Sequence, residues 1–153
     1  MTIQTHMYRE ICEIPDATRR LLNQGREAIE TAADDLRRTA PLFISTVARG
    51  SSDHAATYFK YASELTLGLP VASIGPSIAS IYSAKLQLGK SACIGISQSG
   101  QSPDIVKMTQ SANNQGALTV AITNEFSSPL AKACKHTIPI YAGTEQSVAA
   151  TKT

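Results

Sequence analysis

The sequence predicts an α/β protein, a three-layer αβα sandwich in which helices cover both faces of a five-stranded parallel sheet. Two observations predict this class. Five short apolar segments alternate with segments of helical periodicity, and apolar strands joined by helical crossovers are typical of parallel sheets buried on both faces. The length of 153 residues, with 42% hydrophobic residues, also suits one domain with a single core.

The N-terminal segment, residues 1–41, is expected to be helical and to precede the sandwich. Asp16 follows Pro15 and can cap a helix, and apolar residues then recur at near-helical spacing as far as about Arg38. We therefore expect an amphipathic helix from Asp16 to Arg38. One face of such a helix must pack on a core or on a partner.

The sandwich itself is expected over residues 42–153. Its predicted strands are residues 42–48, 70–75, 91–97, 117–123 and 136–142. Its predicted helices are residues 51–68, 77–88, 102–116 and 128–134. The last residues, GTEQSVAATKT, resemble a loop that enters a new helix. Either a final helix is missing or the chain is part of a longer protein.

Composition argues against several classes of function. The three cysteines, Cys12, Cys93 and Cys134, are widely spaced without a CxxC pair, which disfavours a disulfide framework and favours a reducing cytoplasm. The net charge is only +2 without a basic cluster, so we expect no nucleic-acid partner. No apolar run reaches the roughly 20 residues of a membrane span. His6 and His136 lack partners at ligand spacing, so no metal site is expected.

The segment SQSGQSPD follows the predicted strand 91–97 and opens a helix. Ligands of open parallel sheets bind beyond the carboxyl ends of the strands. There, the amides of a helix N-terminus attract anions, and the side chains of Ser97, Gln98, Ser99 and Ser102 add neutral donors. A phosphate monoester fits this chemistry. An ordinary capped turn has the same composition, so this loop alone does not decide between the two readings.

A second loop, RGSSDH, follows the predicted strand 42–48 and also opens a helix. Its Ser51 and Ser52 are expected at the same edge of the sheet, where both loops can converge on one ligand. Neither loop has a P-loop motif, and no GxGxxG follows a strand, so a nucleotide is not the expected ligand. In a third loop, Glu145 could act as an acid or base and Lys152 could contact an anion or carbonyl. A solvated carboxylate and a helix-end cation remain the alternatives.

At these loops the sequence resembles the SIS (sugar isomerase) family of phosphosugar-binding domains. The motifs RGSSDHA, ISQSGQSPDI and AGTEQSVAATK carry the resemblance, which extends over residues 42–153. They are most similar to the first SIS domain of two-domain glucosamine-6-phosphate deaminases and to the isomerase half of glucosamine-6-phosphate synthases. The segment REICEIPDA is similar to the one that precedes that isomerase half. Because no glutaminase domain is present, we expect a deaminase or isomerase rather than a synthase.

The resemblance implies a flavodoxin-like SIS fold that binds an amino-sugar 6-phosphate. The implied phosphate-binding residues are Ser52, Ser97, Gln98, Ser99 and Ser102. The implied sugar-binding residues are Ser51, Val148, through its backbone carbonyl, and Ala150, where the synthases carry Ser.

The resemblance also has implications for the whole protein. The catalytic groups of two-domain relatives lie in the second half, so no catalytic residue can be named here, and we expect the protein to continue into a second SIS domain. No cofactor is expected. The protein is expected to form a homodimer. The alternatives are a ketose/aldose phosphate isomerase or deglycase of the same family and a non-catalytic phosphosugar sensor.

Overall fold

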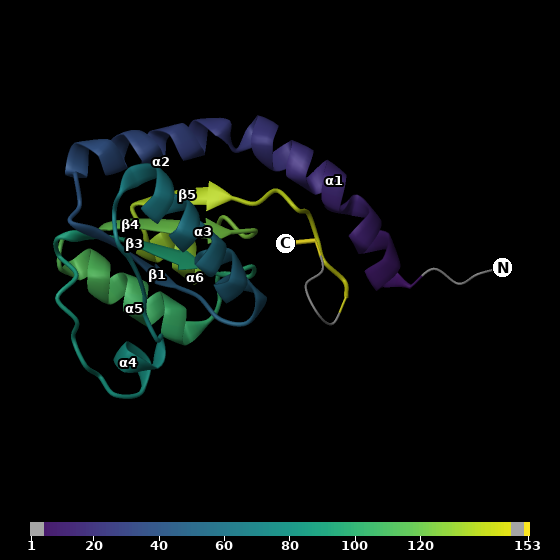
Figure 1. Ribbon diagram of the computed structural model, residues 1–153. Coiled ribbons are helices and arrows are strands. Elements are labelled where there is room, and N and C mark those ends of the chain that lie inside the picture. The colour runs from purple at the N-terminus through teal and green to yellow at the C-terminus, as the bar shows by residue number, and fades with distance from the viewer. Residues whose placement is uncertain (1–4, 148–151) are drawn as a thin grey trace.

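The computed structural model describes residues 5–147 and 152–153 and contains one five-stranded, all-parallel sheet (Figure 1). The strands are β1 (Phe43–Val47), β2 (Val71–Ser73), β3 (Ser91–Ile96), β4 (Leu118–Thr123) and β5 (His136–Pro139). Their order is β2-β1-β3-β4-β5, which is that of flavodoxin-like, doubly wound sheets. The predicted fold class is confirmed.

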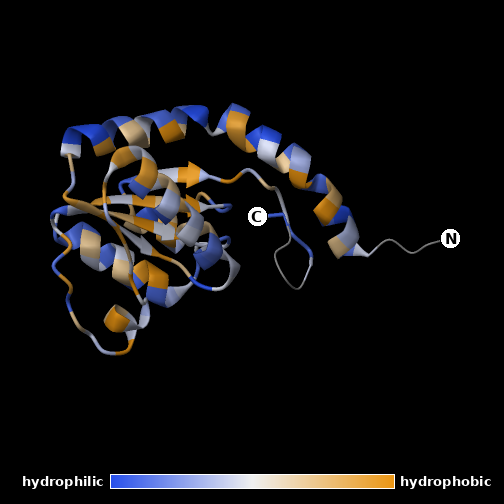
Figure 2. Ribbon diagram, in the orientation of Figure 1, coloured by the Kyte–Doolittle hydropathy of each residue, from blue (hydrophilic) through white to orange (hydrophobic). Residues whose placement is uncertain are grey.

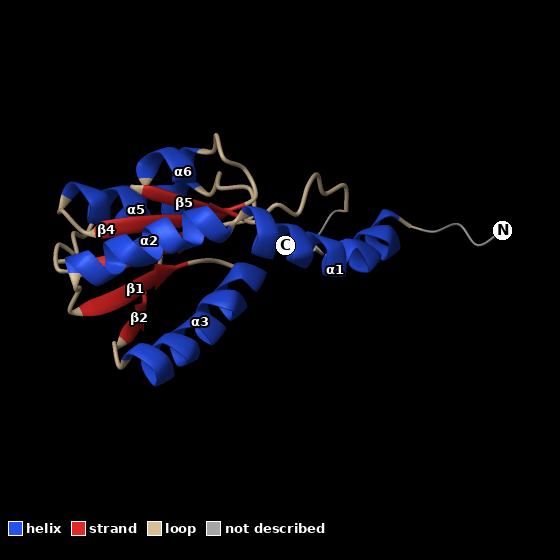
Figure 3. Cartoon of the chain, turned by 90° about the horizontal axis from the view of Figure 1, so that it is seen from above, coloured by secondary structure: helices blue, strands red, loops and turns tan. Residues whose placement is uncertain are grey.

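Helices cover both faces of this sheet (Figures 1 and 3). The helices are α1 (His6–Gln24), α2 (Arg26–Thr39), α3 (Ser51–Leu67), α4 (Ser77–Ser80), α5 (Pro103–Asn114) and α6 (Pro129–Ala133). Helices α2 and α3 pack on one face, and α5 and α6 pack on the other with α4 beside α5. Among the described residues, no helix has the length and apolarity needed to cross a membrane.

The core consists of two apolar clusters, one on each face of the sheet. Strand β3 is buried at all six positions, and its side chains alternate between the clusters. Ile94 and Ile96 join the cluster under α2 and α3, whereas Cys93 joins the one under α5 and α6. Burial raises the pKa of the Cys93 thiol to about 11, so this cysteine is a protonated core residue. Figure 2 shows the resulting pattern, with apolar strands between helices of mixed polarity.

The N-terminal helical segment differs from the prediction. Helix α1 begins at His6, where Thr5 accepts a hydrogen bond from the Tyr8 amide (3.2 Å), and it contains Pro15 in its interior. The predicted helix start at Asp16 is therefore wrong. The break between helices falls at Gly25 instead. Contacts between α1 and the C-terminal part of the chain, described below, stabilise the turns before the proline.

The predicted helix over residues 77–88 is also wrong beyond its first turn. Helix α4 ends at Ser80, and Ser83 has a positive φ of 52° that interrupts any continuation. Ile81 and Tyr82 are 74% and 75% exposed, whereas Leu88 is buried in the core. An irregular segment places Leu88 against the sheet without covering Ile81 and Tyr82, so tertiary packing overrides the helical periodicity.

A buried carboxylate fastens α2 to the start of β5. Asp35 is 5% exposed. Its Oδ2 atom accepts hydrogen bonds from Lys135 Nζ and His136 Nε2, each at 2.7 Å, and its Oδ1 atom accepts one from Arg38 Nη2 at 2.7 Å. The hydrogen bonds from Lys135 and His136 hold the pKa of Asp35 well below its usual range. The ionised form of Asp35 is therefore the one that the native state stabilises.

We expect Asp35→Asn to lower the urea midpoint of unfolding at pH 7. Above about pH 4, the ordinary pKa of Asp, the wild-type carboxylate contributes its full stabilisation. Below that pH the unfolded chain binds the proton more tightly than the native state, so the contribution decreases. The variant should therefore lose less stability than the wild type on acidification. Urea unfolding as a function of pH measures both effects.

The matched control is Asp34→Asn, on the same helix. Asp34 pairs with Arg37 at 2.6 Å, but both side chains are at least 70% exposed, and such surface pairs contribute little. Equal midpoints and equal pH profiles for the two variants would contradict the assigned role of Asp35.

Candidate functional site

Two polar loops leave the same edge of the sheet. Strands β1 and β3 are paired in parallel, so the loop of residues 48–50 and the loop of residues 97–102 both start at the carboxyl edge. Arg49, in the first loop, pairs with Asp104 at the start of α5, with 2.7 Å between Nη1 and Oδ2. This ion pair joins the loop of residues 48–50 to the start of α5 and offsets the negative charge of Asp104 there.

The loop of residues 97–102 is held in one conformation by bonds within itself and to β4. The Gly100 amide donates to Ser97 Oγ at 3.2 Å. The Gln98 carbonyl accepts hydrogen bonds from the Asn124 amide (3.0 Å) and from Thr123 Oγ1 (3.1 Å). Gly100 has a φ of +62°, and a Cβ atom at this position would lie 2.2 Å from Ser128 Oγ. Only glycine fits this tight turn.

The loop leads into α5 with the features of an anion site. Ser102 occupies the N-cap position, but its side chain makes no capping hydrogen bond. Pro103 takes the first helical position, and Ser99 is half-buried, its Oγ accepting from the Gln101 amide at 3.3 Å. The helix dipole adds positive potential at this end of α5. The hydroxyls of Ser99 and Ser102 are thus placed beside a helix N-terminus.

Ser51 and Ser52 are the first two residues of α3, after Gly50, which has a φ of +58°. Ser51 is exposed and Ser52 is half-buried. Ser97 is only 6% exposed, so its hydroxyl serves the turn. Val148 and Ala150, which were expected to contact the sugar, lie outside the described residues.

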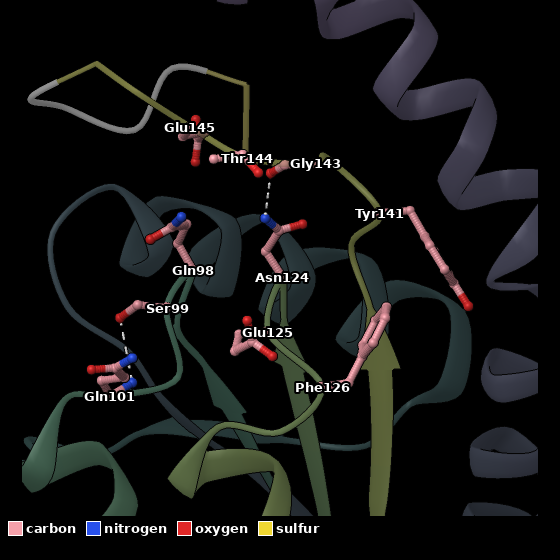
Figure 4. Close-up of a pocket in the computed structure, with 10 residues that line it drawn as sticks. All are labelled: Gln98, Ser99, Gln101, Asn124, Glu125, Phe126, Tyr141, Gly143, Thr144 and Glu145. Carbon is pink, nitrogen blue, oxygen red and sulfur yellow. Dashed lines mark hydrogen bonds between the residues drawn. The ribbon is translucent and has the colours of Figure 1, made fainter.

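A cavity of about 540 Å³ adjoins the loop of residues 97–102 (Figure 4). It is lined by Gln98, Ser99, Gln101, Asn124, Glu125, Phe126, Tyr141, Gly143, Thr144 and Glu145. Of the residues expected from the sequence to bind the ligand, Gln98 and Ser99 line it and Ser51, Ser52, Ser97 and Ser102 do not. The pocket therefore extends from the polar loop toward β4 and β5.

The loops after β4 and β5 supply residues that the sequence reasoning missed. Asn124, Glu125 and Phe126 follow β4, and Tyr141 follows β5. The same rule that selected the earlier loops, polar residues at the carboxyl end of a strand, could have found Asn124 and Glu125. In Figure 4, Gln98 and Asn124 both point toward the segment that carries Thr144.

Both a carboxylate and aromatic rings line this pocket. The Glu125 carboxylate accepts hydrogen bonds from the Ser127 hydroxyl (2.8 Å) and amide (3.1 Å), which lower the pKa of Glu125. The rings of Phe126 and Tyr141 pack edge to face with centroids 5.5 Å apart. The pocket thus offers an ionised carboxylate next to an aromatic wall.

The third polar loop is engaged within the protein. Glu145 accepts hydrogen bonds from the Lys152 amide (3.0 Å) and from Thr153 Oγ1 (2.8 Å). Lys152 is turned away from the cavity, since its Nζ lies 2.5 Å from Glu13 Oε2 on α1. Across residues 5–147 and 152–153, no group of three His, Cys, Asp or Glu side chains is arranged to hold a metal ion.

The amino-acid sequence matches known proteins over most of the chain. Residues 43–153 match the SIS domain family. The chain is 36% identical over 149 residues to the glutamine–fructose-6-phosphate aminotransferase (isomerizing) of Methanothermobacter thermautotrophicus, covering 96% of this chain and 24% of that protein. The protein of the same name from Aquifex aeolicus is 34% identical over 150 residues, with the same coverage.

Solved protein structures are also similar to this chain over nearly its whole length. A Silicibacter pomeroyi protein assigned as a phosphosugar isomerase is 58% identical with a TM-score of 0.92, covering 97% of this chain and 46% of that one. The C-terminal domain of a glucosamine-fructose-6-phosphate aminotransferase from Francisella tularensis is 25% identical with a TM-score of 0.81, covering 99% and 43%. The chain thus spans about a quarter of the curated relatives and less than half of these structures. By its matching residues and its fold, the chain belongs to the SIS domain family.

Proposed function

We propose that this chain binds an amino-sugar 6-phosphate and forms the N-terminal half of a deaminase or isomerase that acts on it. The observation that carries the proposal is the continuity between the loop of residues 97–102 and the cavity. Ser99 and Gln98 belong to both. A ligand with a phosphate at one end and a polyol at the other can therefore occupy the two regions together.

The phosphate end is assigned to the N-terminus of α5. Its amides and the hydroxyls of Ser99 and Ser102 are the donors of an anion site, and Ser52 at the start of α3 lies beyond the adjacent strand β1. The donors are neutral, so they suit a phosphate that must be held and then released. Arg49 is paired with Asp104 of α5, so it is not assigned as a phosphate donor.

The sugar end is assigned to the pocket beside β4 and β5. A volume of about 540 Å³ lies within the range of small-molecule sites. Gln98 and Thr144 can hydrogen-bond sugar hydroxyls, and ionised Glu125 favours a ligand with an ammonium group. This last feature supports an amino sugar over a neutral one.

The chemistry requires groups that we assign to a second SIS domain. Deamination needs ring opening, proton transfer between C2 and C1 and loss of ammonia, which are steps of general acid–base catalysis. A grip on the phosphate converts binding energy into orientation of the reacting carbons. The 46% coverage of the Silicibacter pomeroyi protein supports a longer parent chain. Assays of the full-length protein for ammonia release and for aldose–ketose interconversion would distinguish a deaminase from an isomerase.

The location proposed for this protein is the reducing cytoplasm. Cys12, Cys93 and Cys134 are all free thiols. Burial also raises the pKa of Cys134, to about 12, so that this cysteine stays protonated.

We expect Ser99→Ala to raise the Kd for glucosamine 6-phosphate roughly 10- to 100-fold, the value of one hydrogen bond to a charged group. The unfolding midpoint should hardly change, because the Ser99 hydroxyl accepts only a 3.3 Å hydrogen bond from Gln101. Calorimetric titration measures the affinity. Ser111→Ala, at the other end of α5, is the control and should bind as the wild type does. Equal affinities of both variants would refute the assignment of the phosphate end.

We expect Glu125→Gln to weaken binding of glucosamine 6-phosphate by about tenfold while leaving that of fructose 6-phosphate unchanged. The carboxylate attracts the ammonium group of the amino sugar but has no such partner in the ketose phosphate, which has a hydroxyl in place of the amine. Competitive titration of the two ligands against the wild type and the variant measures the ratio. A parallel loss for both ligands would show that Glu125 does not select the amine.

A further inference from the structure

Helix α1 extends beyond the sheet on the side of the candidate site. In Figures 1 and 3 the segment that follows β5 runs beside it. This segment, residues 141–147, includes Tyr141, Gly143, Thr144 and Glu145 of the pocket lining. It belongs to no helix or strand, so its position depends on contacts with other parts of the chain.

Arg20 binds the beginning of this segment from the α1 side. Its Nε atom donates to the Tyr141 carbonyl at 2.9 Å, and its Nη2 atom donates to the Ala142 carbonyl at 3.2 Å. The planar guanidinium group offers several donors with fixed relative directions. Arg20 is half-buried and binds two successive carbonyl groups more than 120 residues away in the sequence.

Asn124 binds the same turn from the sheet side. Its side chain accepts from the Ala142 amide at 2.9 Å and donates to the Gly143 carbonyl at 2.7 Å. Tyr141, directly before the residues that Asn124 binds, has a positive φ of 57°. This conformation is costly for a residue with a large side chain. The left-handed turn of Tyr141, which aims the chain toward the pocket, is therefore maintained by contacts on both sides.

Glu10 binds the far end of the segment. Its carboxylate accepts hydrogen bonds from the Gln146 amide (2.5 Å), from the Ser147 amide (3.3 Å) and from the Ser147 hydroxyl. Glu10 is only 5% exposed. Helix α1 thus contacts the segment at both ends, through one cation that binds carbonyl groups and one anion that binds amides.

We infer that α1 holds the sugar-side wall of the pocket and that Arg20 is a positioning residue for ligand binding. The inference rests on the proposed function, because it assigns the sugar end of the ligand to this wall. The phosphate end lies at the loop of residues 97–102, which Arg20 does not contact. Loss of Arg20 should therefore weaken recognition of the sugar and preserve recognition of the phosphate.

The test compares Arg20→Met with Arg19→Met. Arg19 is adjacent on α1, but its side chain is 69% exposed and pairs with Asp16. For each variant, calorimetry measures the Kd for glucosamine 6-phosphate and for inorganic phosphate. We expect Arg20→Met to raise the first Kd by roughly tenfold and to leave the second unchanged, whereas Arg19→Met should change neither. Amide hydrogen exchange of residues 141–147 should be faster in Arg20→Met alone.

Each outcome bears on one of the two claims. Wild-type affinity for the sugar phosphate in Arg20→Met would overturn the inference, and so would an equal loss for inorganic phosphate, which indicates a general loss of structure. A wild-type protein that binds neither ligand would contradict the proposed function. The exchange rates would still test whether Arg20 holds residues 141–147 in position. Arg20→Lys, which keeps a donor for one carbonyl, should show intermediate affinity and gives the same test if Arg20→Met does not fold.

Discussion

The parallel pairing of β3 with both β1 and β4 is the constraint on which the site depends. Because these three strands run in the same direction, every loop that follows them starts at one edge. The loop of residues 97–102 leaves from the central strand and is bound to the end of β4 through the Gln98 carbonyl. The proposed anion site at the start of α5 and the pocket are therefore neighbours because of the sheet topology.

Close packing under this loop explains its small residues. Gly95 in β3 lies against Thr109 and Leu130, and a Cβ atom there would be 2.9 Å from Thr109 Oγ1. A Cβ atom at Gly100 would come even closer to its neighbour, 2.2 Å from Ser128 Oγ. The two glycines bring α5 and α6 against the sheet, so that the N-terminus of α5 is fixed relative to the strand end. A rigid N-terminus can bind an anion with little loss of conformational entropy.

The wall of the pocket that follows β5 is held in position by side-chain contacts and not by pairing within the sheet. The residues after β5 form no regular structure, and the contacts of Arg20, Asn124 and Glu10 fix them instead. Helix α1 lies partly outside the sandwich, and three of its apolar side chains, Met7, Ile11 and Ile14, remain 39% to 48% exposed. Polar contacts of Arg20 and Glu10 join the helix to the segment whose position it fixes.

The sequence by itself determined the strands, the fold class and the polar loop of residues 97–102, because apolar runs and helix-start residues act locally. Only the tertiary structure decided the rest. Pro15 looked like a helix boundary, yet contacts such as that of Glu10 with Ser147 hold the turns before it in α1. The pocket residues Asn124 and Tyr141 and their partner Arg20 are far apart in the chain. Which side chains meet across such separations is set by packing, which no local pattern records.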